Sequence, residues 1–231
     1  MVKNLLLLGG SHSELPLIFA AQRLGFRVIT TGNNPLDYGH KFSDEYVFGD
    51  FSDVTAMIDL AKSLNVEAIC AGCNDFAAIS AAAIAEELNL PGHDPLDLSR
   101  ILHHKSSFYS LANEAGLPVP FSFEVTSLEA AHEVAIGIGF PIIVKPIDLT
   151  GGKGISIAHS VEDLENAWNY ARQQTREAST VIQKYITGTN HAISSLILNQ
   201  QIQFSFIDNE HYFTNPHLVG AASFPSTLTL E

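Results

Sequence analysis

A lysine at the end of an apolar run, followed closely by a glycine-rich loop, is the strongest candidate for chemistry in this sequence. Residues 139–146 read Gly-Phe-Pro-Ile-Ile-Val-Lys-Pro, and the loop Thr150-Gly151-Gly152-Lys153-Gly154 comes next. A lysine that ends a buried strand needs an anion or water, because an unpaired buried charge is costly. Glycines allow positive φ and close backbone approach, so their amides can wrap a phosphate. The pattern predicts phosphate binding; the structural alternative is a flexible hairpin turn with Lys145 in solvent.

Neither of the two common glycine-rich nucleotide motifs describes these segments. A P-loop reads G-x-x-x-x-G-K-[ST]. With Gly152-Lys153 as its Gly-Lys, it would need Gly at position 147 and Ser or Thr at position 154, but these residues are Ile and Gly. The opening turn, Gly9-Gly10-Ser11-His12-Ser13-Glu14, lacks the third glycine of G-x-G-x-x-G. A nicotinamide or flavin cofactor, and with it an oxidoreductase, is therefore poorly supported.

The only cysteines, Cys70 and Cys73, spell C-x-x-C. A zinc site needs further ligands, and a thioredoxin-like site opens a helix, whereas Cys70 falls within an expected strand. We interpret both as buried structural cysteines, and their scarcity favours a reducing compartment such as the cytoplasm. His103 and His104 would point about 100° apart on a helix, so we expect surface histidines rather than a metal site.

The first half of the chain alternates short apolar runs with helical patterns. We expect strands at 4–8, 26–30, 46–48 and 66–71, and helices at 15–24, 52–64 and up to about 88. Continuously apolar strands indicate a parallel sheet covered on both faces. Ligands bind at the carboxyl ends of such strands, where Gly9, Gly10, Asn74 and Asp75 fall. Asp75 could equally cap the helix that follows it.

A second unit follows a proline-containing linker. Leu98 to Ala115 is typical of one helix or of two helices in succession, and Pro118 and Pro120 favour extended chain after it. Beyond it we expect strands at 121–125, 141–146, 155–158 and 180–185, and helices at 127–137 and 161–175. A hairpin of 192–198 with 201–207 opens a third piece.

Four motifs in this order resemble the ATP-grasp superfamily of carboxylate–amine ligases, in its purine-pathway, biotin carboxylase and carbamoyl-phosphate synthetase branches. They are Lys105 at a helix start ahead of Ala-Gly-Leu-Pro-Val-Pro, Ile138 to Pro146, Gly151 to Ile155, and Val181-Ile-Gln-Lys-Tyr-Ile-Thr-Gly188. The likeness runs from residue 4 to the end of the chain. It implies an α/β fold: a parallel-sheet, Rossmann-like pre-ATP-grasp domain (1–98), a helical linker (99–120), an α+β lid (121–187) and an incomplete third subdomain (188–231).

The resemblance also implies how ATP is held. Lys105 and Lys145 would hold phosphates, and the loop of Gly151, Gly152, Lys153 and Gly154 would fold over them. The hinge Gln183 to Ile186 would contact adenine, mainly through the backbone of Lys184 and Ile186. Gln183 stands where the family usually has Glu, and Asn190 where many members have a ribose-binding Glu, so both would bind without charge assistance.

By the same resemblance, Gly9, Gly10, Asn74 and Asp75 would form part of the second substrate's site. The family's Mg²⁺ is held by Glu and Glu-x-Asn on late strands. The stretch 215–231, rich in Pro, Ser and Thr, has no such motif, so we expect no metal ligand in this chain and interpret it as part of a longer ligase.

The whole protein would activate a carboxylate or bicarbonate as an acyl phosphate, for attack by an amine or thiol. This truncated chain would bind nucleotide weakly without turnover. The alternative is a non-catalytic nucleotide- or metabolite-binding protein of the same fold.

Composition and charge agree with a globular protein that binds small molecules. Apolar residues make up 46% and charged residues 16%, which excludes disorder, and about one and a half domains fit the length. Twelve Lys and Arg against twenty-five Asp and Glu give a net charge of −13. This charge disfavours nucleic-acid and anionic-membrane partners, leaving a small-molecule carboxylate and nucleophile as partners, with a homodimer left open. The apolar run of residues 5–8 is too short to span a bilayer.

Overall fold

The computed structural model describes residues 2–213 and 216–228. The chain divides into two compact units, Met1–His104 and Lys105–Glu231, each with a hydrophobic core of its own. Within the described residues, no helix has both the length and the apolar character needed to cross a membrane. The four-part division expected from the sequence stays a prediction.

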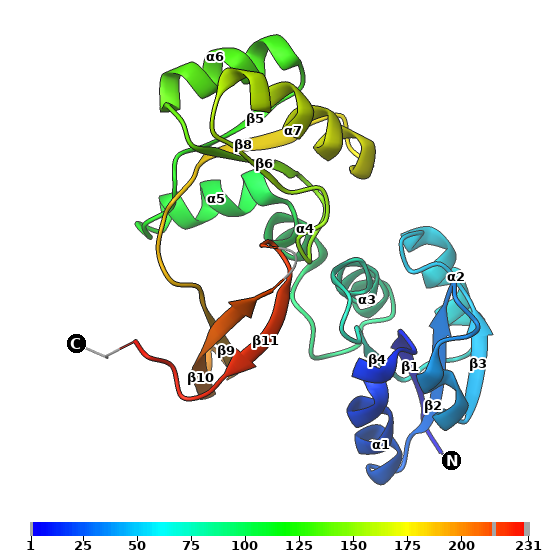
Figure 1. Ribbon diagram of the computed structural model, residues 1–231. Coiled ribbons are helices and arrows are strands. Elements are labelled where there is room, and N and C mark those ends of the chain that lie inside the picture. The colour runs from blue at the N-terminus through cyan, green and yellow to red at the C-terminus, as the bar shows by residue number, and fades with distance from the viewer. Residues whose placement is uncertain (1, 214–215, 229–231) are drawn as a thin grey trace. The chain divides into compact units, whose positions relative to one another are not determined.

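The first unit is built on a parallel sheet in the order β3-β2-β1-β4 (Figure 1). Its strands are β1 (Asn4–Leu8), β2 (Arg27–Gly32), β3 (Glu45–Phe48) and β4 (Ala68–Cys70). Between and after them come η1 (His12–Glu14), α1 (Leu15–Arg23), η2 (Tyr38–Phe42), α2 (Val54–Ser63), α3 (Asp75–Glu87) and α4 (Leu96–His103). The predicted parallel sheet in alternation with helices is confirmed.

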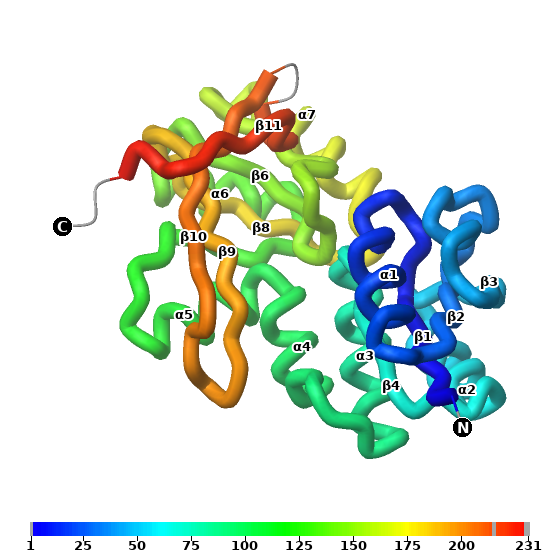
Figure 2. Tube along the Cα trace, turned by 90° about the horizontal axis from the view of Figure 1, so that it is seen from below, coloured from blue at the N-terminus to red at the C-terminus, as the bar shows by residue number. Residues whose placement is uncertain are grey.

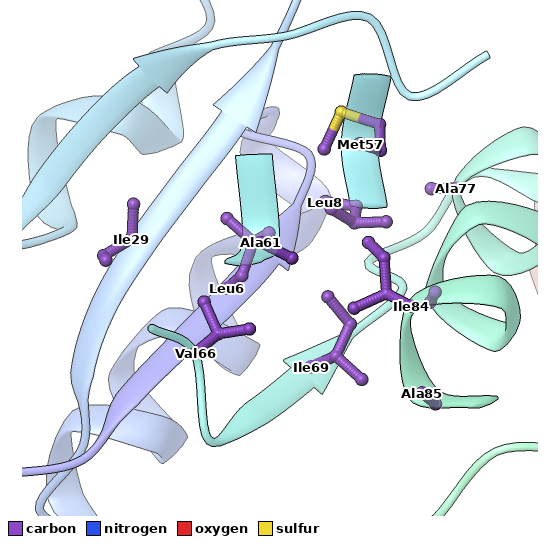
Figure 3. Close-up of a cluster of buried hydrophobic side chains, with 11 residues drawn as sticks. Leu6, Leu8, Ile29, Met57, Ala61, Val66, Ile69, Ala77, Ile84 and Ala85 are labelled. Atoms are coloured by element: carbon purple, nitrogen blue, oxygen red, sulfur yellow. The ribbon is translucent and has the colours of Figure 1, made fainter. Parts of the chain in front are cut away.

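Alternate side chains of β1 enter two different cores, which explains why the strand is apolar throughout. One core joins the even-numbered leucines to α2 and α3 (Figure 3), and includes Leu6, Leu8, Met57 and Ile84. The other core joins the odd-numbered leucines to α1, and includes Leu5, Leu7 and Ile18. Because both faces are covered, polar groups at this sheet concentrate at the strand ends.

Asn74, rather than Asp75, caps α3. The Asn74 side-chain oxygen accepts a hydrogen bond from the Phe76 N–H at 3.0 Å. Asp75 is the first residue of the helix and is exposed. The interpretation of Asp75 as the cap was therefore wrong by one position, since the capping residue must precede the first helical residue.

The second unit contains an antiparallel sheet in the order β5-β8-β6-β7. After α5 (Lys105–Glu114) come β5 (Ser122–Val125), α6 (Leu128–Ile138), β6 (Ile142–Pro146), β7 (Ser156–Ala158), α7 (Val161–Gln174) and β8 (Thr180–Lys184). Helices α6 and α7 lie on one face of this sheet and α5 on the other (Figure 1). The predicted helix from 98 to 115 is two helices, α4 and α5, with His104 extended between them.

The face of the sheet toward α6 and α7 is the core of this unit. It joins apolar residues of β6, β8 and both helices, including Ile142, Val144, Ile182, Ala131, Leu164 and Trp168. Strand side chains alternate between faces, so Ile143, Lys145 and Gln183 point to the opposite face. That alternation places the charged end of β6 outside the apolar core.

A three-stranded antiparallel sheet completes the described chain: β9 (His191–Leu198), β10 (Gln201–Tyr212) and β11 (Val219–Ser223). Strands β9 and β10 run side by side in Figure 2, and β11 pairs with β10 on its other side. The predicted hairpin is confirmed, and its two-residue turn has positive φ at Asn199 and Gln200, as a type I′ turn requires. Strand β11 lies in the stretch 215–231, where no strand was predicted.

Candidate nucleotide site

The Lys145 ammonium contacts the side-chain amide of Gln183, whereas the sequence predicted an anion or water as its partner. Its Nζ donates a hydrogen bond to Gln183 Oε1 at 2.7 Å. Because a lysine ammonium has no acceptor, the amide atom facing it must be the oxygen. Within residues 2–213 and 216–228, no acidic side chain forms an ion pair with Lys145. Burial lowers the pKa of the Lys145 ammonium, and no carboxylate offsets that effect.

The other half of the Gln183 amide has no partner. Gln183 is only 4% exposed, and its Nε2 has no hydrogen bond within the described residues. An unsatisfied buried donor costs about 1–3 kcal/mol. The pair thus keeps unused N–H donors on both residues and no free acceptor, and of the two it is Lys145 that can offer its donors to a ligand.

Lys145 opens onto a cavity of about 400 Å³, a volume typical of small-molecule sites. Polar side chains on its wall come from β6, from the segment after β8, from β10 and from residue 217: Lys145, Thr187, Asn190, Tyr212 and His217. Burial, and then the charge of Lys145, lowers the pKa of His217. Sequence reasoning missed Tyr212 and His217, because only the third sheet brings them to this wall.

Tyr212, on the wall of the cavity, is hydrogen-bonded to a carboxylate. The Tyr212 hydroxyl donates to Glu210 Oε2 at 2.6 Å. Burial and this contact raise the pKa of Tyr212 to about 12. Glu210 is therefore an acceptor already in use, and Tyr212 stays protonated at neutral pH.

The glycine loop has the backbone its composition predicts. Gly151, Gly152 and Gly154 have φ of +64°, +73° and +70°, values that a side chain disfavours. A Cβ on Gly152 would lie 2.0 Å from the His217 carbonyl oxygen, so the loop rests against that segment. Lys153 is exposed at the tip of the loop.

Lys105 lies at the base of the same loop. Its backbone N–H donates to the Ile147 carbonyl at 3.3 Å, and its Nζ donates to the Leu149 carbonyl. Asp148, between them, is 5% exposed and accepts from the Arg176 N–H at 3.1 Å. The structure thus brings Lys105, Lys145 and the glycine loop together in one unit.

The hinge residues are only partly available to a ligand. The Lys184 N–H donates to the Phe121 carbonyl at 2.9 Å, and its Nζ to the Gly139 carbonyl at 2.9 Å. A ligand could therefore meet the backbone of Lys184 only at its carbonyl. Ile186 and Asn190 both line the cavity, and Ile186 is 66% exposed.

In the first unit, Glu14 organises the strand ends where Gly9, Gly10 and Asn74 were expected to act. Glu14 is 3% exposed and accepts from the Ser11 N–H at 2.7 Å and the Cys73 N–H at 3.0 Å. It thereby ties the turn after β1 to the turn after β4. Sequence reasoning missed Glu14, whose acidic side chain at a helix start resembles an ordinary capping residue.

Position 10 has room only for glycine, because the ring of His40 packs against it. A Cβ on Gly10 would lie 2.0 Å from the His40 ring, which is 8% exposed and has its Nδ1 2.9 Å from Thr30 Oγ1. Gly10 and Gly9 are both buried. Their role as substrate ligands stays a prediction, and their packing role is what the contacts show.

The cysteine and histidine pairs differ from expectation. Cys70 ends β4 and is half-buried, but Cys73 is exposed, so the interpretation of both as buried is wrong for Cys73. The His103 ring packs on Phe76 with centroids 4.9 Å apart instead of lying free on the surface. The described part of the chain holds no group of three or more His, Cys, Asp and Glu that could bind a metal ion.

Comparison with known proteins agrees with this geometry. Residues 104–203 match the family described as carbamoyl-phosphate synthase L chain, ATP binding domain. The chain is 35% identical over 174 residues to a formate-dependent phosphoribosylglycinamide formyltransferase of Burkholderia pseudomallei, covering 73% of this chain and 42% of that protein.

Two solved structures share the fold. The N5-carboxyaminoimidazole synthetase of Staphylococcus aureus complexed with ADP has a TM-score of 0.80 at 16% identity, over 98% of this chain and 59% of that one. The biotin carboxylase domain of Hydrogenobacter thermophilus 2-oxoglutarate carboxylase, in complex with MgADP and bicarbonate, has a TM-score of 0.67 at 24% identity, over 84% and 46%.

The fold is α/β: a unit with a parallel sheet is followed by a unit with an antiparallel sheet, and in the second unit Lys145 lines a cavity of about 400 Å³. The chain belongs to the ATP-grasp superfamily. It spans less than half the length of the curated relatives it matches.

Proposed function

We propose that this chain supplies the nucleotide-binding part of an ATP-dependent ligase that joins a carboxylate to an amine or thiol. The observation that carries the proposal is the Lys145 ammonium, which is half-buried, lines a cavity of about 400 Å³ and has no carboxylate partner among the described residues. Its one printed acceptor is the buried amide of Gln183, whose own Nε2 has no partner there. Such a donor set fits the acceptor oxygens and ring nitrogens of a nucleoside triphosphate. Superfamily membership supports the same ligand.

In the proposed reaction, a carboxylate or bicarbonate takes the γ-phosphoryl group of ATP and becomes an acyl phosphate. An amine or thiol then attacks the acyl carbon, and phosphate leaves. Lys145 would hold phosphate oxygens and offset their charge, which is where most catalysis of phosphoryl transfer lies. Lys105, at the base of the loop, and Lys153, at its tip, would add positive charge near the same phosphate oxygens. The glycine loop would exclude water from them.

The described residues provide contacts for phosphate groups but no group of side chains suited to Mg²⁺. Nothing in residues 2–213 and 216–228 groups three potential ligands around one point, and Glu210 is engaged by Tyr212. No step is therefore assigned to a metal held by this chain. Mg²⁺ stays an expectation of the resemblance.

A second candidate function is a nucleotide- or metabolite-binding protein without catalysis. The observation that favours it is the pair of amides at the nucleotide site, since Gln183 and Asn190 carry no charge to orient a base or ribose. Phosphate release on supplying candidate carboxylates and amines to the whole protein separates the two. Release that depends on both substrates supports the ligase, and none with any pair supports the binding protein.

Gly9, Gly10, Asn74 and Asp75 are proposed to contact the non-nucleotide substrate. We also propose small-molecule partners and a cytoplasmic setting, as for metabolic enzymes of this superfamily. Alanine at Asn74 should weaken binding of the carboxylate or amine without changing affinity for ATP, which titration of the whole protein measures.

Isothermal titration with ATP and Mg²⁺ tests the nucleotide site. We expect Lys145→Met to weaken ATP binding at least tenfold, because a charge-assisted contact to phosphate contributes about 1.5–3 kcal/mol. Lys3→Met is the matched control, since Lys3 is an exposed lysine of the first unit. Equal heats for wild type and Lys145→Met would refute the assignment of the site.

A further inference from the structure

The buried carboxylate of Asp148 connects the start of the glycine loop to the end of α7. Its Oδ1 accepts a hydrogen bond from the Thr175 hydroxyl at 2.5 Å, and its Oδ2 accepts from the Arg176 N–H at 3.1 Å. Thr175 is the C-cap of α7. Because Asp148 is only 5% exposed, these contacts with the protein hold its carboxylate in place.

The residues on either side of Asp148 hold Lys105. The Lys105 N–H donates to the Ile147 carbonyl at 3.3 Å, and its Nζ donates to the Leu149 carbonyl. A lysine ammonium sits on a flexible four-carbon stem, so its position depends on the acceptors that hold it. A displacement of residue 148 would move both carbonyls, and the Lys105 ammonium with them.

The far end of the glycine loop is packed against the same helix end. A Cβ on Gly154 would lie 2.5 Å from Pro146 Cγ and 3.1 Å from Gln174 Cβ. Pro146 is the last residue of β6, and Gln174 is the last residue of α7. Both ends of the loop therefore meet the end of α7, and Asp148 adds side-chain hydrogen bonds to that contact.

Fold stability alone does not call for a carboxylate at this position. The helix dipole favours a negative charge at the N-terminus of a helix and disfavours one at the C-terminus. Asp163 is at the favourable end of α7, where its Oδ2 accepts from the His159 and Ser160 N–H groups at 3.0 and 3.1 Å. Asp148 lies at the unfavourable end and is buried, where a charge is costly. Its contacts are therefore better explained by what they hold, which is the loop.

We propose that Asp148 is a positioning residue of the nucleotide site. It fixes the start of the glycine loop against α7 and thereby sets where Lys105 and the loop meet the phosphate chain of ATP. The inference rests on the proposed nucleotide-binding function. Asp148 itself contacts no phosphate in this role, because two negative groups repel each other. Its loss should weaken contacts to the phosphates more than contacts to the base and ribose.

Isothermal titration of the 231-residue chain with ATP and with AMP, in Mg²⁺, tests this role. We expect Asp148→Ala to weaken ATP binding about tenfold, the factor expected for losing one hydrogen bond to a charged group. AMP, which has one phosphate of the three, should lose less. Thr175→Val should also weaken ATP binding, whereas Thr175→Ser, which keeps the hydroxyl, should bind ATP as the wild type does. Asp163→Ala is the matched control at the other end of α7 and should change neither affinity.

The outcomes separate this inference from the proposed function. A wild-type chain that binds no ATP would overturn both. Wild-type binding of ATP that Asp148→Ala leaves unchanged, or equal losses for ATP and AMP, would overturn the positioning role and leave the nucleotide site intact. If Asp148→Ala does not fold, the Thr175 variants decide. Equal ATP affinities of Thr175→Val and Thr175→Ser would overturn the role, and weaker binding by Thr175→Val alone supports it.

Discussion

Gly152 is the position where one methyl group should most disturb the proposed nucleotide site. Its φ of +73° is left-handed, and a Cβ there would lie 2.0 Å from the His217 carbonyl oxygen. Gly151 offers a matched control, because its φ of +64° is similar but a Cβ would meet nothing within 4 Å. The two alanine variants therefore separate backbone strain from collision.

Gly151→Ala carries only the left-handed penalty, about 1–2 kcal/mol. Gly152→Ala carries that penalty plus a collision that moves either the loop or the segment at 216–218, about 1–3 kcal/mol more. The chain can relieve this strain by opening the contact between loop and segment, so the effect is local. At tenfold for each 1.4 kcal/mol, the extra strain multiplies opening about 5- to 100-fold.

Amide hydrogen exchange followed by mass spectrometry measures that opening directly. We expect peptides containing 150–154 and 216–219 to exchange faster in Gly152→Ala than in Gly151→Ala, while peptides of α6 exchange alike. Weaker nucleotide binding should accompany the change. Equal exchange of these peptides in the two variants would show that the loop does not rest on the His217 segment, and the reasoning would fail.

Further predictions concern buried polar groups. Burial lowers the pKa of His40 below 6.5, so the unfolded chain binds the proton more readily, and the urea midpoint of the first unit should fall as pH drops from 7 toward 5. Glu14→Ala should lower the stability of that unit by about 2–4 kcal/mol in thermal unfolding, because two backbone N–H groups lose a charged acceptor. Lys145→Met and Gln183→Met should each destabilise the second unit, whereas the double variant should lose less stability than the sum of the two, since replacing both partners leaves no polar group unpaired. Urea unfolding followed by the fluorescence of Trp168, the single tryptophan, measures this.

Each of these predictions has a control. His40→Gln should flatten the pH dependence of the urea midpoint, and His159→Gln, at an exposed position, should not. A urea midpoint that still falls with pH in His40→Gln would show that His40 is not the group responsible. If Glu14→Ala lowers the stability by no more than the loss of an exposed capping residue does, about 1 kcal/mol, the two backbone N–H groups must be hydrogen-bonded to water in the variant. Strict additivity of the two methionine variants would show that Lys145 and Gln183 do not depend on each other.

Most of the fold was predictable because the hydrophobic pattern of each segment matches the way that segment is buried in the folded protein. Leu5 to Leu8 is continuously apolar because both faces of β1 are covered, and that property is visible in the sequence. Strand β11 was not predictable. Val-Gly-Ala-Ala-Ser has no periodicity and its side chains are exposed, so its strand state comes from pairing with β10, where Ala222 lies opposite Glu210. Hydrogen bonding to a neighbour leaves no trace in local composition.

The same distinction applies to the site. Lys145 and the glycine loop stand out because a charge at the end of an apolar strand and three left-handed glycines are local anomalies. The contact between Lys145 and Gln183 joins residues 38 apart and depends on the register of β6 with β8. His217 reaches the cavity through the third sheet. Which amide faces the lysine is therefore a property of the register, and no motif encodes it.

Buried polar groups in the two units differ in a way that bears on function. Glu14 is buried with two backbone donors, so its burial is compensated within the protein and a structural role accounts for it. Gln183 is equally buried but half satisfied, and the lysine it holds has no counterion among the described residues. A folded protein retains such an uncompensated cost where function requires it. Lys145 has a neutral acceptor in Gln183 but no counterion, and it lines the cavity, so an anionic ligand there would supply the charge that the described residues do not.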